Sequence, residues 1–483
     1  MMKKRFWAGI LALIALLVPL TSCKKGSNEG GETKETIELD TSDGYDYGKL
    51  DCQNGDFTFL QCDEDRWNMK TVLAPEADAQ GDDISDAVYS RNAKIATIYN
   101  VNIKCINRDI YETGDFVRTQ AMGGETAVDA AFVIGSSVAA LISEGLLNDI
   151  SAMNDVQIYE PWWGQGLRED SQFGGASTLY YAQSDISLTA FDLTWCVAVN
   201  MDRITALDME NPYELVENKQ WTIEKLLAMS KEGMSPNVDG TYTYTEGTDC
   251  IFGFTTYNNF TLAALNGAGC FLTRKNDIGL PAFTGEGERF LDVVERYATA
   301  FHSDGMTAIA NDEGFHYEEM FADGRALFAG VEVKALTKFR ALEMHYGVIP
   351  VPLYDVNQER YYSTVNYLAP LLVIPNTNTD GNKTGRILDT MAYLSYKDVL
   401  PVYYVNNLSL KAVKDPESSK MLDIIRDTRC FETSLLYGWT EDFYLEVRDV
   451  LAGYVPNTSA TSAIRKYRDT IIGKLDAFAA GLQ

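Results

Sequence analysis

The sequence predicts an α/β protein whose folded body is divided into two lobes. Strand-like and helix-like segments alternate along the chain, which is typical of lobes built around mainly parallel sheets. The segment from about residue 56 to residue 483 is longer than one hydrophobic core usually supports, so two cores are expected. Hydrophobic residues make up 46% of the chain, which is an ordinary fraction for a globular protein, so the body should fold.

The N-terminus has the order of a secretory signal. A basic segment over residues 1–5 is followed by an apolar run over residues 6–20 and then by Thr21, Ser22 and Cys23. The apolar run is shorter than the ~20 residues that a spanning helix needs. Residues 20–23 resemble a bacterial lipobox, in which the signal is cut before the cysteine and its sulfur is acylated. We therefore expect a signal peptide over residues 1–22 and a lipid on Cys23; the alternative is an ordinary signal followed by a chance cysteine.

Residues 23–55 are expected to form a disordered linker behind the lipid. Residues 24–46 are rich in Gly, Glu, Ser, Thr and Asp, and almost no large apolar residue occurs before Ile37. Such a segment buries too little apolar surface to offset the entropy lost on ordering. No later run is long and apolar enough to span a bilayer, so the sequence indicates a protein that works beside a membrane and touches it only through the anchor.

The charge of the chain excludes several partners. The formal net charge is −28, and removal of the three basic residues of the signal lowers it to −31. A chain this acidic should repel nucleic acids and anionic lipids. We therefore expect no nucleic-acid partner, and we interpret the acidity chiefly as a source of solubility.

The cysteines predict free thiols rather than a metal site. Seven cysteines remain after Cys23, and an odd number outside the cytosol leaves at least one unpaired. No Cys-x-x-Cys pair and no Cys/His cluster occurs, so no zinc site is expected. Most of the cysteines lie in apolar runs, where a thiol behaves as a small hydrophobe. Cys250 and Cys270 are the one pair that merits a disulfide test.

The order of predicted elements follows from residue periodicity. Strands are expected at residues 56–60, 101–106, 128–134, 195–200, 326–331, 346–350 and 369–375. Helices are expected at residues 84–99, 138–144, 290–301, 315–321, 384–396 and 464–478, with another beginning at Trp221. A serine should cap the helix at residue 138, and Thr222 should cap the helix that begins at Trp221.

Several passages, in this order along the chain, resemble the extracellular solute-binding protein family, the sugar-type receptors of ABC importers. These passages are VDAAFV at residues 128–133 with GLLNDI at 145–150, WCVAVNMDRI at 195–204, WTIEKL at 221–226, FADGRALF at 321–328 and YGVIPVP at 346–352. The resemblance covers about residues 56–483. It implies a two-lobe, periplasmic-binding-protein-like fold with a hinge and a ligand cleft between the lobes. Lobe 1 would comprise residues 56–183 and 347–404, and lobe 2 residues 184–346 and the C-terminal helices of residues 405–483.

The resemblance also implies a function. It indicates a monomeric, lipid-anchored receptor on the extracellular face of the bacterial cytoplasmic membrane that captures a mono- or oligosaccharide and delivers it to ABC permease subunits. It implies no cofactor, no metal and no enzyme activity; the Gly-x-Ser-x-Gly, His-Glu-x-x-His and Walker motifs are also absent from the sequence. Two alternatives stay open. The protein is a surface glycan-binding protein without a permease, or it is a receptor for a non-sugar polar solute.

A sugar receptor needs flat aromatic rings for the apolar faces of the sugar and planar polar groups for its hydroxyls. Most candidate ligand residues flank predicted strands or the first predicted crossing between lobes. The resemblance implies the others: Tyr257 and Asn258 match a loop that supplies cleft residues in relatives, and Trp439 lies in a late aromatic segment that often caps the cleft. Glu332 ends a predicted strand at a place where the family often has an aromatic residue. The alternative for each is a structural role, such as a solvated turn at Asp63 or helix capping at Ser136. Trp162 and Trp163 are expected to pack on a lobe surface. The candidates are Asp63, Arg66, Trp67, Ser136, Ser137, Asp185, Tyr257, Asn258, Glu332, Asn366, Tyr367 and Trp439.

Overall fold

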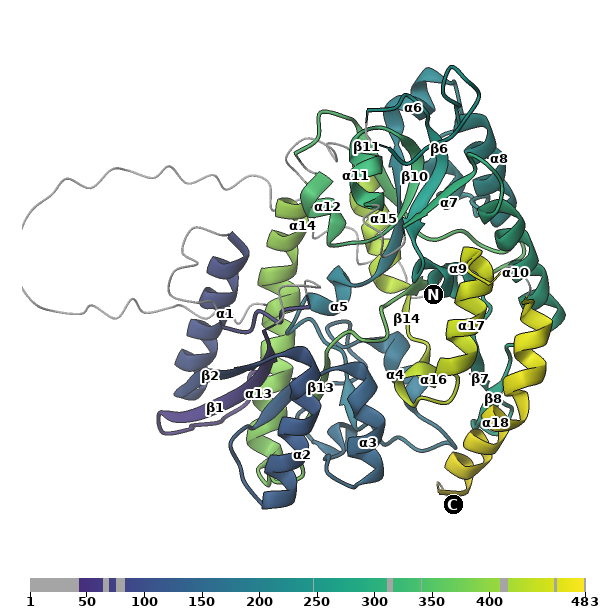
Figure 1. Cartoon of the computed structure of the whole chain (residues 1–483). Helices are drawn as coiled ribbons and strands as arrows, with labels where there is room; N and C mark the ends of the chain where they lie inside the picture. The colour runs from purple at the N-terminus through teal and green to yellow at the C-terminus, as the bar shows by residue number, and fades with distance from the viewer. Residues whose placement is uncertain are drawn as a thin grey trace, which may run out of the picture. The chain divides into compact units, whose positions relative to one another are not determined.

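Two five-stranded sheets organise the folded part of the chain (Figure 1). The computed structural model describes residues 43–63, 69–74, 83–245, 247–310, 316–339, 341–408, 416–455 and 458–481. Gly44–Gln483 forms one unit, distinct from Met1–Asp43. The signal peptide, Cys23 and most of the predicted linker therefore lie outside the described residues, as do Arg66 and Trp67.

The first sheet has the strand order β2-β1-β3-β13-β4. Its strands are β1 (Gly55–Cys62), β2 (Val101–Arg108), β3 (Ala130–Val133), β4 (Tyr181–Ala182) and β13 (Leu371–Val373). β1 runs parallel to β2 and β3, whereas β13 runs antiparallel to β3 and β4. Successive side chains of β1 enter different cores: Phe57 and Phe59 pack in one cluster, and Leu60 and Cys62 in another. Both faces of the central strands are therefore covered, which explains why β3, β4 and β13 are apolar, whereas the outer strand β2 keeps polar residues such as Lys104 and Asn107.

The second sheet has the strand order β11-β5-β10-β6-β9. Its strands are β5 (Trp195–Asn200), β6 (Phe252–Tyr257), β9 (Thr307–Ala310), β10 (Ala326–Glu332) and β11 (Tyr346–Ile349). β6, β9 and β10 are parallel, and β5 is antiparallel to both β10 and β11. Trp195 and Val197 pack in one core, and Cys196 and Ala198 in another.

Helices and short strands complete the unit. The helices of the N-terminal half are α1 (Asp83–Tyr99), α2 (Thr113–Gly123), α3 (Val138–Ser143), α4 (Gln165–Ser171), α5 (Thr189–Asp192), α6 (Met201–Ala206), α7 (Pro212–Glu217) and α8 (Ile223–Gly233). Those that follow are α9 (Phe260–Gly267), α10 (Glu288–Phe301), α11 (Tyr317–Ala322), α12 (Ala335–Phe339), α13 (Gly381–Leu394), α14 (Leu400–Leu408), α15 (Pro416–Asp427), α16 (Thr433–Leu436), α17 (Glu441–Ala452) and α18 (Ala460–Gly481). The short strands are β7 (Thr273–Lys275) with β8 (Pro281–Phe283), and β12 (Ser363–Thr364) with β14 (Arg429–Cys430).

The predicted elements are present, and one predicted cap is not. Each predicted strand and helix overlaps an observed one, and Thr222 caps α8 by accepting a hydrogen bond from Lys225 N at 3.3 Å. The predicted serine cap of α3 is wrong: Ser137 stands at the N-cap position but makes no side-chain capping bond. The reason is that residues 135–137 form a 3₁₀ turn, so Ser137 has helical backbone angles instead of the extended ones that a capping serine needs.

The chain passes between the two sheets three times. The first crossing, residues 183–194, joins β4 to β5, and the second, residues 350–370, joins β11 to β13. The third runs from α13 through α14 to α15, which packs against β11. The sequence predicts a return to the first lobe at residue 347, but β11 pairs with β5 in the second sheet, so the chain reaches the first sheet only at β13.

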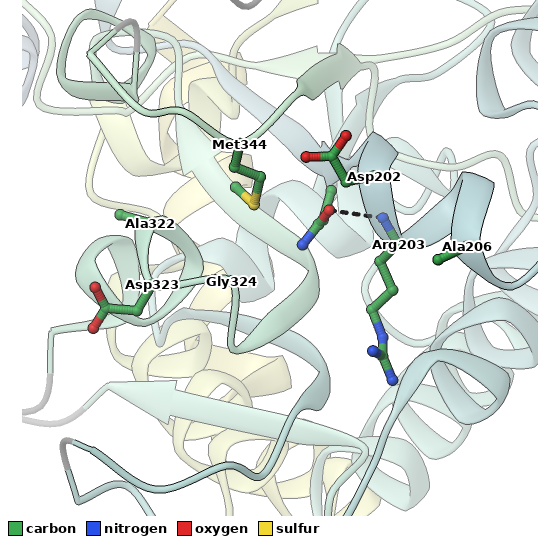
Figure 2. A pocket seen from close by; sticks show the side chains of 8 residues that line it. Asp202, Arg203, Ala206, Ala322, Asp323, Gly324 and Met344 are labelled. Carbon is green, nitrogen blue, oxygen red and sulfur yellow. Dashed lines mark hydrogen bonds between the residues drawn. The ribbon is translucent and has the colours of Figure 1, made fainter.

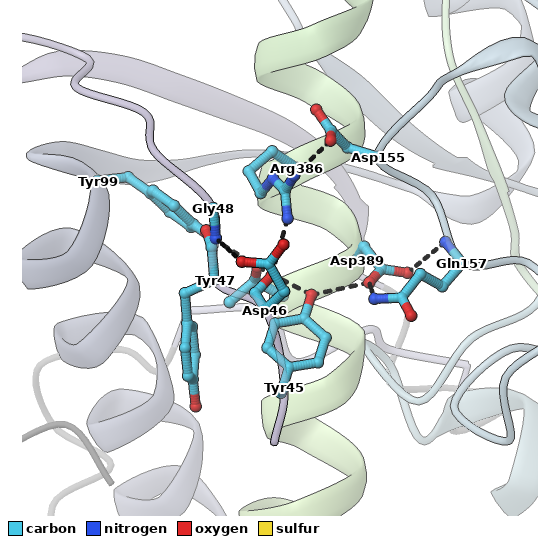
Figure 3. Close-up of polar contacts among 10 residues, drawn as sticks. Tyr45, Asp46, Tyr47, Gly48, Tyr99, Asp155, Gln157, Arg386 and Asp389 are labelled. Atoms are coloured by element: carbon cyan, nitrogen blue, oxygen red, sulfur yellow. Dashed lines mark hydrogen bonds and ion pairs between the residues drawn. The ribbon is translucent and has the colours of Figure 1, made fainter. Parts of the chain in front are cut away.

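Part of the predicted linker packs on the first sheet's helices. Residues 45–48, which we call the N-terminal strap, lie against α13 (Figure 3). The Tyr45 ring stacks on Tyr393 at a centroid distance of 4.1 Å, and its hydroxyl donates to the buried Asp389 at 2.7 Å. Trp162 and Trp163 donate to the same carboxylate through their indole N–H groups. The aromatic side chains of the strap gain enough buried contact to order a segment that its polar neighbours would leave disordered.

The seven described cysteines all have free thiols, as predicted. Cys250 and Cys270, the pair singled out for a disulfide test, belong to two different apolar clusters. Within the described ranges, no helix combines the length and apolar character that crossing a bilayer requires.

Candidate functional site

The carboxyl ends of parallel strands bring three candidate residues to one edge of the second sheet. Tyr257 ends β6, Asn258 follows it, and Glu332 ends β10, which runs parallel to β6. Glu332 pairs with Trp195, the first residue of β5. In open α/β sheets, ligands collect at this edge. The second sheet therefore presents an aromatic ring, an amide and a carboxylate where a ligand is expected.

Four tyrosines gather at this edge, and we call them the tyrosine cluster: Tyr257, Tyr317, Tyr367 and Tyr444. The rings of Tyr257 and Tyr317 stack at 6.3 Å, and those of Tyr367 and Tyr444 meet edge to face at 6.2 Å. Tyr257 lies close enough to both Tyr317 and Tyr444 to influence the pKa of their hydroxyls, which places the two pairs side by side. The four residues come from β6, α11, the second crossing and α17, so only the folded chain assembles them.

Three phenols of the cluster, those of Tyr317, Tyr367 and Tyr444, stay protonated at neutral pH because their pKa values are raised. Burial raises the pKa of Tyr317 well above its usual value, and the nearby carboxylates of Glu318 and Glu332 raise it further. Burial likewise raises the pKa of Tyr367 and of Tyr444. Each neutral hydroxyl can both donate and accept a hydrogen bond, as a sugar hydroxyl can.

Asn258 offers an acceptor without a protein partner. Its side chain is 9% exposed, and Oδ1 receives no hydrogen bond from any described residue. Its backbone oxygen accepts from the Thr261 hydroxyl at 2.8 Å, which holds the residue in place. An unpaired buried acceptor costs free energy, so a ligand donor at Oδ1 would remove a penalty that the free protein carries.

Glu332 belongs to a polar network at the crossings, the crossover network of Asp192, Glu332, Lys334, Asn366 and Tyr403. Glu332 is 5% exposed, its Oε1 accepts from Asn366 Nδ2 at 2.9 Å, and its Oε2 pairs with Lys334 Nζ at 2.6 Å. The Tyr403 hydroxyl donates to Asp192 Oδ1 at 2.5 Å. Burial raises the pKa of Asp192 to about 6; the hydrogen bond from Tyr403 and the charge of Lys334 oppose this shift, and the charge of Glu332 adds to it.

The first sheet contributes a turn and a tyrosine to the same region. Ser136 is exposed and Ser137 half-buried, both in the 3₁₀ turn after β3. Gly135 lies so close to the second crossing that a Cβ on it would stand 2.3 Å from the Tyr367 carbonyl oxygen. Tyr111, which is 57% exposed, interacts electrostatically with Tyr367. Groups of both sheets therefore meet around Tyr367.

The structure gives the other candidates protein partners. Asp63 is exposed and pairs with Lys70 at 3.2 Å. Asp185 is 4% exposed, and its carboxylate accepts from Arg426 at 2.6 Å. Trp439 is buried in the core of the second sheet and stacks on Tyr437 at 4.6 Å.

A pocket of about 420 Å³ lies at the opposite edge of the second sheet (Figure 2). It is lined by Asn200, Asp202, Arg203 and Asp323 among others, and Asn200 is the last residue of β5. Since β5 is antiparallel to β10, this pocket and Glu332 mark different edges. Asn200 Oδ1 accepts from Arg203 N, and Arg203 Nε donates to the Gly233 carbonyl, so these groups serve local structure.

Comparison with known proteins finds matches among solved structures. No family model matches the sequence, and no curated protein matches it. An ABC substrate-binding protein from Listeria monocytogenes in complex with cycloalternan is 12% identical, with 87% of this chain and 99% of that chain covered and a TM-score of 0.56. The GacH receptor of Streptomyces glaucescens, solved unliganded and with acarbose, is 15% identical, with 89% and 98% covered and a TM-score of 0.54.

The chain has the two-lobe fold of ABC solute-binding proteins. The predicted fold class is thereby confirmed. UgpB from Mycobacterium tuberculosis in complex with glycerophosphocholine shares the fold at 13% identity, with 82% of this chain and 97% of that chain covered and a TM-score of 0.55. The fold thus accommodates ligands with quite different polar groups.

Proposed function

We propose that the protein captures a mono- or oligosaccharide between its two lobes and delivers it to the permease of an ABC transporter. The tyrosine cluster carries this proposal. The half-buried rings of Tyr257, Tyr317 and Tyr367 supply apolar faces for pyranose rings and hydroxyls that donate and accept hydrogen bonds beside them, and the buried Tyr444 holds the Tyr367 ring in place. The acceptor of Asn258 and the carboxylate of Glu332 add directional hydrogen bonds at the same sheet edge.

Structures of the same fold support a carbohydrate ligand. Cycloalternan, acarbose and maltotetraose are the ligands bound in three of them. In the proposed site, Asp63, Ser136 and Ser137 contact the ligand from the first sheet, and Arg66 and Trp67, which follow Asp63 in the sequence, are proposed to contribute as well. Tyr257, Asn258, Glu332, Asn366 and Tyr367 contact it from the second sheet and the second crossing, together with Tyr317, and the buried Tyr444 supports Tyr367. Asp185 and Trp439 support the site indirectly, through Arg426 and Tyr437.

The proposal includes attachment to the membrane. A lipid on Cys23 would hold the monomeric receptor on the outer face of the cytoplasmic membrane, beside its permease. The lipobox-like residues 20–23 and the polar segment that follows them support this part. Metabolic labelling with an alkyne fatty acid tests it: the wild-type chain should be labelled, and Cys23→Ser should not.

Thermal unfolding of the chain from residue 24 against a panel of saccharides tests ligand capture. A ligand at a hundredfold excess over its dissociation constant stabilises the folded state by ~2.7 kcal/mol. We expect a stereochemically selective rise of the midpoint with at least one mono- or oligosaccharide and no product by chromatography. Formation of a product would contradict a receptor without enzyme activity. A panel without any shift of the midpoint would contradict a carbohydrate ligand.

The complex of UgpB with glycerophosphocholine motivates one further arm of this panel. Glycerophosphocholine and simple polyols should leave the midpoint unchanged if the site takes sugars. A shift with these solutes alone would instead identify a receptor for a non-sugar polar solute. Uptake of the selected sugar into proteoliposomes that contain the permease separates an import receptor from a surface glycan-binding protein.

A further inference from the structure

The crossover network contains a residue from each of the three crossings. Asp192 belongs to the first crossing, Asn366 to the second and Tyr403 to α14 of the third. Glu332 and Lys334 stand at the end of β10, in the second sheet. The network therefore joins residues of all three crossings to the end of β10.

Backbone hydrogen bonds fix the frame of this network. Val333 N donates to Thr194 O at 2.9 Å, Lys334 N to Asp192 O at 3.0 Å, and Asn366 N to Leu193 O at 2.9 Å. These bonds hold the end of β10 and the first two crossings together. The contact of α14 with Asp192, in contrast, is made by a side chain, through the Tyr403 hydroxyl. A rotation of the lobes can therefore break or lengthen the Tyr403–Asp192 bond more readily than it can separate the backbone frame.

The Tyr403–Asp192 hydrogen bond stabilises a carboxylate that has no ammonium group of its own within the described part of the chain. Two carboxylates, Asp192 and Glu332, share one ammonium group, Lys334, which forms its ion pair with Glu332. Among the side chains that the structure describes, Asp192 has the Tyr403 hydroxyl as its hydrogen-bond donor and Lys334 at longer range. A poorly solvated carboxylate that loses its donor is costly, so the conformation that keeps the donor in place is favoured.

The network also reaches the candidate ligand site. Glu332 interacts electrostatically with Tyr317, and Tyr317 stacks on Tyr257. A ligand hydroxyl that donates to Glu332 would compete with Asn366 for Oε1 or with Lys334 for Oε2. If Lys334 is released from Glu332, its charge can stabilise the Asp192 carboxylate. The loss of the Tyr403 hydrogen bond would then cost less free energy.

We propose that the crossover network sets the angle between the lobes in the ligand-free protein, with the Tyr403–Asp192 hydrogen bond as its releasable link. Through Glu332, the same network connects a ligand at the tyrosine cluster to the hinge. This second part rests on the proposed function, whereas the first part concerns the free protein alone.

Single-molecule energy transfer between the lobes tests the inference. Dyes on noncanonical residues at Met122 and Val238, which are 73% and 104% exposed, report on the first and second lobe. The chain from residue 24 contains the whole folded unit, and Tyr403→Phe removes only the donor hydroxyl. Tyr404→Phe is the matched control, because its hydroxyl interacts with Arg426, Asp423 and, at the first crossing, Asp185, and not with Asp192.

We expect Tyr403→Phe to shift or broaden the ligand-free distribution of transfer efficiencies and Tyr404→Phe to leave it unchanged. The affinity for a saccharide should change by the factor by which the population of the binding-competent state changes, of the order of fivefold. Asp192→Asn should shift the distribution as Tyr403→Phe does, since it removes the charge that requires the donor. A distribution in Tyr403→Phe identical to that of the wild type would overturn the inference. If no saccharide closes the protein, the proposed function fails, while the ligand-free distributions still decide the inference.

Discussion

The Tyr45 hydroxyl should stabilise the first lobe measurably, although it belongs to a segment whose composition predicts disorder. Asp389 is fully buried and, among the described residues, has no ion pair with a basic side chain. Its carboxylate accepts hydrogen bonds from Tyr45 and Gln157 (Figure 3). It also accepts from the indole N–H groups of Trp162 and Trp163. A buried carboxylate without a cation depends on such donors.

The substitution Tyr45→Phe isolates one donor. It keeps the ring that stacks on Tyr393 at 4.1 Å and removes the hydroxyl that lies 2.7 Å from Asp389 Oδ2. A hydrogen bond to a charged group contributes roughly 1.5–3 kcal/mol to stability. The remaining donors compensate in part, so we expect a loss of about 1.5 kcal/mol in the free energy of unfolding.

Urea denaturation followed by tryptophan fluorescence provides the assay, because Trp162 and Trp163 contact the same carboxylate and report on this lobe. Tyr89→Phe, at a residue of α1 that is 68% exposed, is the control and should stay within about 0.5 kcal/mol of the wild type. An unchanged midpoint for Tyr45→Phe would refute the reasoning, since it would mean that the strap does not hold its place in solution.

Three further predictions concern the ligand site and the crossings. Tyr257→Ala should weaken saccharide binding about tenfold or more in calorimetric titration, because an aromatic contact of ~1–2 kcal/mol is lost; unchanged affinity would remove this ring from the site. Burial raises the pKa of Asp192 in the folded state to about 6, above the ordinary pKa of ~3.9. The folded state therefore binds this proton more tightly than the unfolded state, so stability should fall as pH rises from about 4 to about 6. Asp192→Asn should flatten this part of the pH profile of urea midpoints, and a profile equal to that of the wild type would contradict the assignment. Arg426→Met leaves Asp185 buried without its cation and should cost ~3–5 kcal/mol, whereas Asp185→Asn with Arg426→Met should cost less; equal losses in the single and double variants would exclude the coupling.

The sheets could be predicted from the sequence because their strands are short apolar runs between turn residues, and this pattern is local. The sheet to which a strand belongs is not local. The sequence predicts a return to the first lobe directly after Tyr346, yet this strand pairs with β5 through residues about 150 positions earlier. No periodicity within the strand itself distinguishes these partners.

The candidate site was predictable at strand ends and not on helices. Glu332 ends a predicted strand and the resemblance implies Tyr257, and the structure places both at the carboxyl ends of parallel strands, where ligands collect. Tyr317 and Tyr444 were missed because they lie in helices, where a tyrosine has the same pattern as a core residue. Asp185 does lie at a crossing, but its partner Arg426 is 241 residues away and no local signal indicates the pair.

Two short-range signals could have been used. Lys334 follows Glu332 by two residues at the end of an otherwise apolar strand, and opposite charges at such a place indicate a buried ion pair. Tyr45 and Tyr47 are aromatic residues in an otherwise polar segment, which indicates that they pack against another part of the chain. Both patterns indicate contact with the rest of the chain without identifying the partner.

Calorimetric titration with the saccharide selected by thermal unfolding tests the central claim most directly. We predict that the wild-type chain binds one saccharide molecule with no turnover. We predict that the double variant Tyr257→Ala with Tyr367→Ala binds it at least about a hundredfold more weakly, while its urea midpoint shows that the lobes remain folded. Equal affinity in the folded double variant would contradict a ligand site at the tyrosine cluster.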